Sequence, residues 1–492
     1  MTRPARLVAV DLGAETGRAV LAEMDGEHLS VEEVRRFPNR PVDVAGTLHW
    51  DVLRLYADVL DTIRGIGELR SIGIDTWGVD FGLIDRNGRL VGNPVHYRDR
   101  RTDGMVDEAL RRVSREYIYS QTGIQFMPIN TLYQLLALVT SRDPQLEAAD
   151  RLLTMPALLA YWLTGIKADE FTDVTTTQCF APRAGHWATD LLTRLDIPTH
   201  IFGEVVQPGT DLGRPRTELG LAATRVIAPA THDTASAVAA VPFKSAHSAA
   251  YISSGTWSLV GVEIREPVIN DDALEANLSN EGGVAGTFRL LKNVMGLWLL
   301  QECRRAWTAA GVDLAYEDLL RLAEGAPPFQ AVIDPDDDQL LGPGDMPTRI
   351  VKLASDSGQS LPTEPGPIAR CIFESLALKY RLTISQLEQV TRSTIQTIHI
   401  VGGGAKNWVL CQMTADACGR SVVAGPSEAT AIGNILMQAI SLGLISTLDQ
   451  GRLLVRRSVQ LTTYHPRRRS EWDEVSQRFL AAKDPKSYRK LA

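Results

Sequence analysis

DLGAETGR, residues 11–18, joins two apolar stretches and decides how the chain begins to fold. LVAV precedes it and AVLAEM follows it, so residues 6–24 are predicted to form a β-hairpin. The turn carries two glycines, a threonine and an acidic residue. A turn that only reverses the direction of the chain would not require this combination. One interpretation is a plain turn. The other is a turn whose backbone N–H groups hold a phosphate.

Composition excludes several classes of protein. The chain has 492 residues, enough for two or three domains. Its net charge of −8 argues against a nucleic-acid partner, and no apolar run is long enough to cross a membrane. Five scattered cysteines without a C-x-x-C pair, and an apolar start interrupted by Asp11, predict a cytoplasmic protein without disulfides or a signal peptide.

The opening pattern returns about halfway along the chain. AAYISSGTWSLVGVEI, residues 249–264, is again a strand, a small Gly-containing turn and a strand. This recurrence indicates two related halves that meet near residues 242–247. We therefore predict an N-terminal domain over 1–243, a C-terminal domain over 244–465 and a tail over 466–492.

Helical and strand signals alternate along the chain, which indicates an α/β fold. Asp51 is expected to cap the first helix. The other elements are predicted from periodicity, apolar runs and turn residues. They are a strand near 29–37, a helix over 50–66, two short strands joined by a turn in 70–85, mostly helix over 103–165, a strand running into a helix over 225–241, helices over 294–309 and 367–391, a loop over 334–347, and a strand TIHIV that ends in GGG, residues 402–404.

The phosphate signals are unusual. The sequence has no Walker A motif and no usable G-x-G-x-x-G, which disfavours a P-loop enzyme or a dinucleotide-binding dehydrogenase. Instead, three Gly-containing turns follow strands, at 13–17, 253–256 and 402–404. Each alone is typical of an ordinary turn. Two similar hairpin turns and a GGG together favour phosphate binding.

Acids lie at the ends of apolar runs. Asp11 is either a turn residue or a carboxylate that meets Mg²⁺ through water, since Mg²⁺ keeps most of its waters. Asp75 and Asp80, in IDTWGVDF, need polar partners, which a polyol would supply. Trp77 between them is either a core residue or a cover for one face of a sugar.

Asp233 lies in THDTASA, where a predicted strand meets a helix. It is either a helix cap or a general base that accepts a hydroxyl proton during phosphoryl transfer. His232 and Thr234 flank it and could bind substrate hydroxyls. No G-x-S-x-G elbow is present, which disfavours a serine hydrolase.

These stretches together resemble the FGGY family of carbohydrate kinases, in the sugar kinase, hexokinase and actin superfamily. The resemblance covers about residues 7–465 and is carried by SIGIDTWGVDFGLID, THDTASAV, YISSGTWSL, NEGGVAGTFRLLKNVMGLWLLQ and HIVGGGAKN, among others. It implies two RNase H-like domains of the actin-type ATPase fold, with ATP in a cleft between them and the ketose in the N-terminal half. It further implies Mg²⁺-assisted phosphorylation of L-rhamnulose at its 1-hydroxyl.

The resemblance also implies roles for particular residues, with Asp233 as the catalytic base. The residues expected to contact the sugar are Gly78, Asp80, His232, Asp233, Thr234 and Asn293. Those expected to line the nucleotide are Ala14, Glu15, Thr16, Gly17, Arg18, Thr256, Gln301 and Gly403, and Asp11 is expected on the metal side.

Two departures from the family pattern stand out. The family's phosphate turn often has Ser-Ser where this chain has Glu15-Thr16. A carboxylate facing ATP would repel it, so we expect Glu15 to turn outward or to meet the metal's water shell. Some relatives also pair cysteines in the C-terminal half, but Cys371 has no obvious mate here and Thr414 stands four positions before Cys418.

Alternatives remain open at this stage. The substrate could be another ketose or polyol, such as L-fuculose, L-ribulose or L-xylulose. The chain could also be a non-catalytic sugar or nucleotide sensor on the same fold, or an actin-like assembly protein, although the last would have no use for THDT and DTWGVD. The predicted partners are a small-molecule ketose and ATP, and the predicted state is a monomer or small homo-oligomer.

Overall fold

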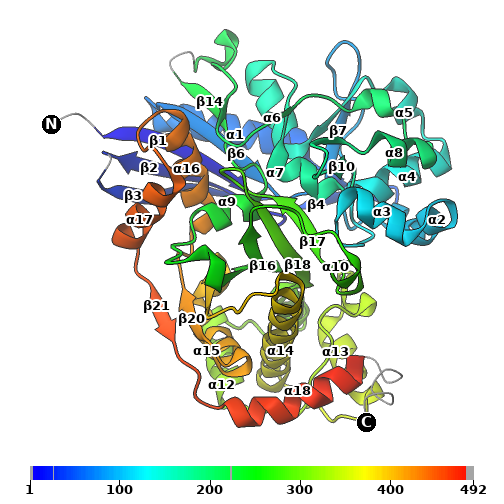
Figure 1. Cartoon of the computed structure of the whole chain (residues 1–492), viewed down its shortest axis with the longest axis vertical. Coiled ribbons are helices and arrows are strands. Elements are labelled where there is room, and N and C mark those ends of the chain that lie inside the picture. Colours follow the sequence, from blue (N-terminus) through cyan, green and yellow to red (C-terminus); the bar gives the residue numbers. More distant parts are fainter. Residues whose placement is uncertain (1–3, 26, 222–223, 484–492) are drawn as a thin grey trace. The chain divides into compact units, whose positions relative to one another are not determined.

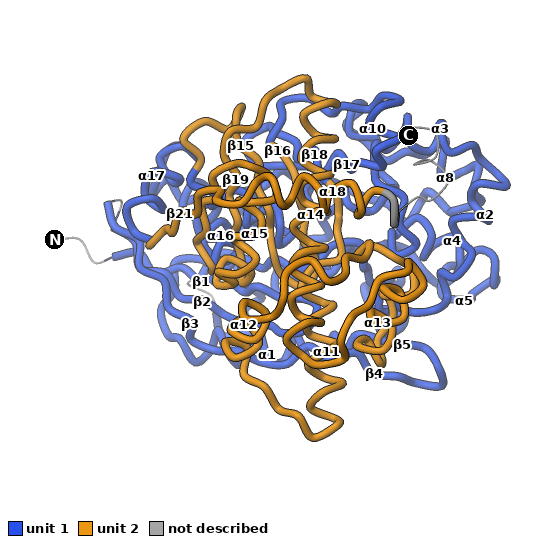
Figure 2. The backbone as a smooth tube through the Cα atoms, turned by 90° about the horizontal axis from the view of Figure 1, so that it is seen from below, with its two compact units in different colours: residues 1–242, 263–291, 428–459 blue, residues 243–262, 292–427, 460–492 orange. Residues whose placement is uncertain are grey.

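The protein is described here from a computed structural model, which covers residues 4–25, 27–221 and 224–483. The chain divides into two compact units, shown in separate colours in Figure 2. Unit 1 comprises Met1–Pro242, Glu263–Leu291 and Glu428–Val459, and unit 2 comprises Phe243–Val262, Lys292–Ser427 and Gln460–Ala492. The predicted domains over 1–243 and 244–465 divide the chain by sequence order and stay a prediction.

A six-stranded mixed sheet forms the centre of unit 1, in the order β13-β14-β6-β1-β2-β3 (Figure 1). Strands β14, β6 and β1 run parallel, and β1, β2 and β3 form an antiparallel meander. Unit 1 also contains β17, which pairs with the first half of β18. The strands of unit 1 are β1 (Ala5–Leu12), β2 (Thr16–Met24), β3 (Leu29–Pro38), β4 (Pro41–Val44), β5 (Thr47–Trp50), β6 (Ser71–Thr76), β7 (Phe81–Ile84), β8 (Arg151–Thr154), β9 (Asp169–Glu170), β10 (Phe180–Ala181), β11 (His186–Trp187), β12 (Val205–Val206), β13 (Thr210–Asp211), β14 (Arg225–Ala228) and β17 (Ser279–Gly282).

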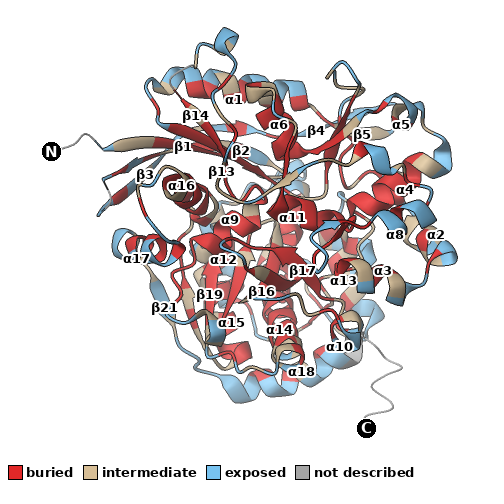
Figure 3. Ribbon diagram, turned by 45° about the horizontal axis from the view of Figure 1, so that its top comes forward, coloured by how far each residue is buried: buried red, intermediate tan, exposed pale blue. Residues whose placement is uncertain are grey.

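Helices cover both faces of this sheet. Side chains alternate between faces along β6, so Ile74 meets α6 while Gly73 meets α16. Figure 3 shows β1 buried along most of its length, as expected for a strand covered on both sides. The helices of unit 1 are α1 (Val52–Ile66), α2 (Met105–Arg112), α3 (Arg115–Thr122), α4 (Thr131–Ser141), α5 (Pro144–Ala148), α6 (Met155–Thr164), α7 (Phe171–Val174), α8 (Thr189–Arg194), α9 (Asp233–Ala239), α10 (Asp271–Glu275), α16 (Ala429–Ser441) and α17 (Leu448–Ser458).

Unit 2 is built on a second sheet, whose strands follow the order β18-β16-β15-β19-β20-β21. The hairpin β15–β16 is antiparallel, and β15, β19 and β20 run parallel. Helices α12 and α15 pack along the long, buried α14. The elements of unit 2 are β15 (Ala249–Ser254), β16 (Trp257–Ile264), β18 (Phe288–Met295), β19 (Thr397–Val401), β20 (Ser421–Ala424), β21 (Thr462–Tyr464), α11 (Trp298–Ala309), α12 (Tyr316–Gly325), α13 (Met346–Asp356), α14 (Pro365–Thr391), α15 (Trp408–Cys418) and α18 (Arg469–Lys483), with β16 and β18 each continuing into unit 1.

The α/β prediction is confirmed, as are both strand–turn–strand hairpins and the helix over 50–66, which Asp51 caps through the Arg54 N–H. One prediction was incomplete. The two strands in 70–85 do not pair with each other, because β6 joins the main sheet while β7 pairs with β8. The helix predicted from residue 294 begins only at Trp298, since the strand β18 extends to Met295.

All five cysteines are free and buried. Among the described residues, no helix combines the length and apolarity that a membrane crossing requires.

Candidate active site

Three carboxylates gather at the carboxyl ends of neighbouring parallel strands in unit 1. Asp11 on β1 is the register partner of Asp75 on β6. Thr76 then bridges His232, which places the start of α9, and with it Asp233, beside the end of β6. The carboxyl edge of a parallel sheet is where α/β proteins bind ligands. The sequence-predicted acids Asp11, Asp75 and Asp233 are thus brought together.

Asp233 is the first residue of α9, and its side chain is 32% exposed. Its Oδ1 atom accepts a hydrogen bond from the Thr234 N–H and lies 3.2 Å from the Thr234 hydroxyl. Burial, with the charge of Asp11 adding to it, raises the pKa of Asp233 to about 7 against the opposing hydrogen bonds of Thr234. A carboxyl with a pKa near neutrality suits a general base.

Asp75 is fully buried. Its Oδ2 atom accepts a 2.5 Å hydrogen bond from the Asn434 side chain on α16, while Oδ1 has no partner among the described residues. Burial, with the charge of Asp11 adding to it, raises the pKa of Asp75 well above its usual value. Two ionised carboxylates this close would repel each other, so Asp75 is favoured in its neutral form.

The turn of the first hairpin is closed by a hydrogen bond from the Gly13 N–H to the Thr16 carbonyl, 3.0 Å. Asn39, the residue after β3, holds it, since its side chain donates to the Gly13 carbonyl and its N–H donates to the Glu15 carbonyl. Ala14 and Glu15 are partly exposed and Thr16 is exposed. The tip of this turn is therefore at least partly open to solvent.

Gly17 and Arg18 also make packing and ion-pair contacts within the protein. A Cβ on Gly17 would lie 2.2 Å from the ring of Phe37, so this glycine is required for packing. Arg18 donates through Nε and Nη2 to Oδ2 of Asp11, at 2.8 and 2.6 Å, and also pairs with Glu428. Burial alone would lower the pKa of Arg18, but these two carboxylates outweigh it and raise the pKa.

In unit 2, the predicted nucleotide residues surround the second hairpin turn. The N–H groups of Leu297 and Trp298, at the start of α11, donate to the carbonyls of Gly255 and Thr256. Gln301 follows one turn later on the same helix. The GGG stretch reaches the same turn, because a Cβ on Gly404 would lie 2.0 Å from the Ser254 hydroxyl oxygen. Gly403 itself is exposed, with no atom near the position of a Cβ. The stretches that carry Thr256, Gln301 and Gly403 therefore meet at this turn.

Gly78 lies in a strained turn of unit 1. A Cβ on Gly78 would approach the Thr176 hydroxyl to 2.9 Å. The next residue, Val79, has φ +69°, which a β-branched side chain rarely adopts. The Val79 N–H donates to the Thr176 hydroxyl, and the Val79 carbonyl accepts from Thr131 and Gln134. Strain held in place by surrounding hydrogen bonds is typical of functional sites.

Asp80 directly follows Val79 of this turn and is 1% exposed. Its Oδ2 accepts from the indole N–H groups of Trp50 and Trp77, at 2.6 and 3.0 Å, and from the Tyr97 N–H. Its Oδ1 accepts from Gln134. Both oxygens accept from protein donors, which supply the polar partners that a buried carboxylate needs. The contact of Asp80 with a sugar stays a prediction.

Trp77 is buried and packs against Trp50 in a tilted arrangement, with ring centroids 4.0 Å apart. His96 also stacks on Trp50, and burial lowers the pKa of His96 to about 3. The core interpretation of Trp77 is the one that the structure supports. Asn293 on β18 is partly buried in unit 2, whereas the other predicted sugar residues belong to unit 1.

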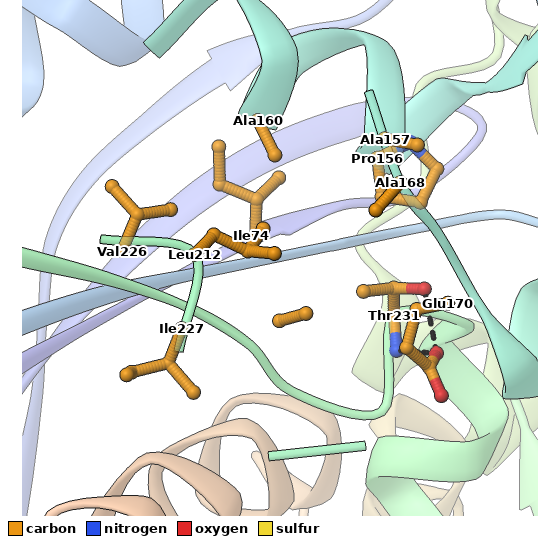
Figure 4. Close-up of a pocket in the computed structure, with 11 residues that line it drawn as sticks. Ile74, Pro156, Ala157, Ala160, Ala168, Glu170, Leu212, Val226, Ile227 and Thr231 are labelled. Carbon is orange, nitrogen blue, oxygen red and sulfur yellow. Dashed lines mark hydrogen bonds between the residues drawn. The ribbon is translucent and has the colours of Figure 1, made fainter. Parts of the chain in front are cut away.

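Three buried residues that support the site were not found from the sequence. Glu170 accepts from the backbone and hydroxyl of both Thr172 and Thr231, and so fixes the residue before His232 (Figure 4). Asn434 holds Asp75, and Arg289 contacts His232. An arginine inside the apolar run FRLLKNVM was a signal for a buried charge, but nothing local names its partner.

No cluster of three or more acidic, histidine or cysteine side chains within the described residues could hold a metal ion. A magnesium ion held mainly by water and phosphate oxygens does not need such a cluster. Arg18 donates only to Oδ2 of Asp11, so Oδ1 is not engaged by Arg18.

Comparison with known proteins identifies the family. Residues 6–240 match the N-terminal domain of the FGGY family of carbohydrate kinases, and residues 250–442 match its C-terminal domain. The chain belongs to this family. It is an enzyme of the carbohydrate kinase class, with the two-domain actin-like ATPase fold that the resemblance implied.

Curated relatives extend over nearly the whole chain. A rhamnulokinase of Bacteroides thetaiotaomicron is 44% identical over 473 residues, which is 94% of this chain and 96% of that protein. A rhamnulokinase of Pectobacterium carotovorum is 41% identical over 490 residues, 98% of this chain and 97% of that protein.

Solved FGGY kinases share the fold. Xylulose kinase from Lactobacillus acidophilus has a TM-score of 0.80 at 17% identity and covers 99% of this chain and 100% of its own. Glycerol kinase from Plasmodium falciparum has a TM-score of 0.75 at 15% identity and covers 97% of this chain and 98% of its own.

Proposed function

We propose that this carbohydrate kinase transfers the γ-phosphoryl group of ATP to the 1-hydroxyl of L-rhamnulose. The observation that carries the proposal is the identity of 40–44% to rhamnulokinases over nearly the full length of both chains. The sequence-based expectations of a cytoplasmic location and of a monomer or small homo-oligomer stay predictions.

Asp233 is the base in this proposal. Its Oδ1 is engaged by Thr234, and Oδ2 makes no hydrogen bond to any described residue. Oδ2 would accept the proton of the 1-hydroxyl while that oxygen forms its bond to the γ-phosphorus and the bond to the β-phosphate oxygen breaks. The products are the sugar 1-phosphate, ADP and the protonated carboxyl, which returns its proton to solvent.

The Gly-containing turns of each unit are the proposed contacts to nucleotide phosphates. In unit 1, the exposed backbone around Thr16 supplies N–H groups. In unit 2, Thr256 would supply a hydroxyl group, Gln301 a side-chain amide and Gly403 an exposed stretch of backbone. Mg²⁺ would neutralise the phosphates when bound, and Asp11 would orient one of its waters through Oδ1.

An ATP-consumption assay over a panel of ketoses with Mg²⁺ tests the proposal. L-Rhamnulose should give the highest kcat/KM among L-rhamnulose, L-fuculose, L-ribulose and L-xylulose, and excess chelator should abolish turnover. A preference of about tenfold or more for another sugar would overturn the substrate and keep the kinase. Absence of sugar-dependent ATP consumption with every ketose would favour the sensor interpretation.

A further inference from the structure

Arg289, on β18, is completely buried in unit 1 next to the residue that precedes the base. Its Nε donates to the Gly282 carbonyl at 2.8 Å. Its Nη2 lies 3.1 Å from Nδ1 of His232 and 3.2 Å from the carboxylate of Glu281. Burying a charged guanidinium costs free energy, which pairing with Glu281 helps to offset. That ion pair does not by itself require Arg289 to contact the imidazole of His232, so this contact needs an explanation of its own.

The contact with Arg289 decides where His232 carries its proton. A guanidinium has only donors, so Nδ1 of His232 must accept. Burial, with the charge of Arg289 adding to it, lowers the pKa of His232 well below its usual value, so the ring is neutral. A neutral imidazole whose Nδ1 accepts carries its hydrogen on Nε2. The competing arrangement, Nδ1–H toward Glu281, would span 3.6 Å, which is too long for a good hydrogen bond.

The Nε2 atom of His232 lies 3.3 Å from Oδ1 of Asp233, a polar contact longer than a good hydrogen bond. We infer that Arg289 is a positioning residue, which holds His232 as the Nε2–H tautomer so that this N–H faces Oδ1 of Asp233, the oxygen that Thr234 hydrogen-bonds, and leaves Oδ2 to the sugar hydroxyl. The inference rests on the proposed role of Asp233 as the base. Because both ring nitrogens of His232 are then engaged, the inference is an alternative to the predicted contact between His232 and a sugar hydroxyl.

The backbone around His232 supports a fixed ring. The His232 N–H donates to the Thr172 hydroxyl, whose own hydrogen goes to Glu170. Thr76 bridges His232 from β6. With the backbone anchored and Nδ1 held by Arg289, the remaining nitrogen has one direction in which to donate.

The test is Arg289→Met, measured with ATP and the ketose that the wild-type enzyme prefers. Loss of the donor frees Nδ1 to take the hydrogen, and Asp233 loses the N–H at Oδ1. We expect kcat to fall by about 10–100-fold, the range for a misplaced reacting group, with little change in the KM for ATP. Arg289→Lys, which keeps a cationic donor, should restore kcat to within about fivefold of wild type.

Arg452→Met is the matched control. Arg452 is also buried in unit 1, pairs with Glu263 and donates to the Val238 and Ala239 carbonyls, but it does not contact His232. It should lower the melting temperature about as much as Arg289→Met and leave kcat within about twofold. If both variants change the melting temperature and neither changes kcat, Arg289 has only a structural role and the inference is wrong.

Variants of His232 decide the matter even if Arg289→Met does not fold. His232→Gln places an amide N–H near the Nε2 position without any dependence on a tautomer, whereas His232→Leu has no donor. The glutamine variant should exceed the leucine variant in kcat by about tenfold or more. Equal kcat values would overturn the inference while wild-type activity still upholds the proposed kinase. A wild type inactive toward every ketose would overturn the proposed function and, with it, the inference.

Discussion

At the scale of single residues, the surroundings that make Asp233 a suitable base also lower the stability of the folded protein above neutral pH. Burial and the neighbouring Asp11 raise its pKa to about 7. The folded protein therefore binds the proton more tightly than the unfolded chain does. The stability that protonated Asp233 contributes is fully present below about pH 4, the ordinary aspartate range, and is lost as the pH rises through about 7. Above neutrality the ionised carboxylate destabilises the fold but can accept a proton.

Asp233→Asn separates these two effects. We expect kcat to fall by about 10²–10⁴-fold, because the amide cannot accept the hydroxyl proton, while ATP binding stays near the wild-type value. At pH 8 the variant should melt at a higher temperature than wild type, and this difference should shrink toward pH 5. A nearly normal kcat would return Asp233 to the role of a helix-terminal residue, for which asparagine serves about as well.

The pH dependence of the wild-type enzyme follows from the same carboxyl. Only ionised Asp233 can act as a base, so kcat/KM for the sugar should rise about tenfold per pH unit below about 7 and level off above it. The measurement is a pH profile at saturating ATP. A profile that is flat between pH 5 and 8 would contradict the assignment of Asp233.

At the scale of elements, α16 connects the parts of the unit 1 site. Asn434 donates to Asp75, and Gln438 one turn later donates to the Val8 carbonyl and accepts from Ser71. Gly433 lies against α9, where a Cβ would come within 1.7 Å of the Ser236 carbonyl oxygen. The helix therefore fixes the end of β6 and the helix that begins with Asp233.

Gly433→Ala tests this role of α16. The added Cβ meets the backbone of α9, so the helix must move and carry Asp233 with it. We expect kcat to fall by about 10–100-fold together with a lower melting temperature. Gly65→Ala in α1 is the control, because a Cβ there meets nothing within 4 Å and alanine favours a helix by up to about 1 kcal/mol. Equal kcat values in the two variants would show that α9 adapts without moving the base.

Elements with local signals were predicted well from the sequence. The hairpin over 6–24, the helix capped by Asp51 and the strand–helix junction at THDT depend on neighbours in the chain. The partner of β7, the contact of Asn434 with Asp75 and that of Arg289 with His232 depend on residues far apart in sequence. Periodicity and capping signals depend on residues close in sequence and say nothing about such pairings. The candidate acids could therefore be found from the sequence, whereas the residues that contact them could not.

At the scale of the whole molecule, unit 1 is assembled from three separate chain segments (Figure 2). The segment Glu428–Val459 includes α16 and follows most of unit 2 in sequence. Without it, β1 and β6 lose their cover on one face, and Asp75 and Ser71 lose side-chain partners. Unit 1 is thus not complete within the first half of the chain.

We therefore predict that a fragment of residues 1–242 does not fold on its own, whereas the same fragment joined through a flexible Gly/Ser linker to residues 428–459 gains a cooperative melt. The reason is burial: α16 supplies apolar side chains such as Ile432, Ile435 and Leu436, and packs against strands β1 and β6, which are buried on both faces. Circular dichroism during heating and dispersion of amide resonances would compare the two proteins directly.

A cooperative transition in the fragment of 1–242 alone, at the temperature of the linked protein, would show that the sheet does not depend on α16. Failure of both proteins would instead point to the third segment, 263–291, which carries Arg289 and its contact with His232, as equally necessary for unit 1.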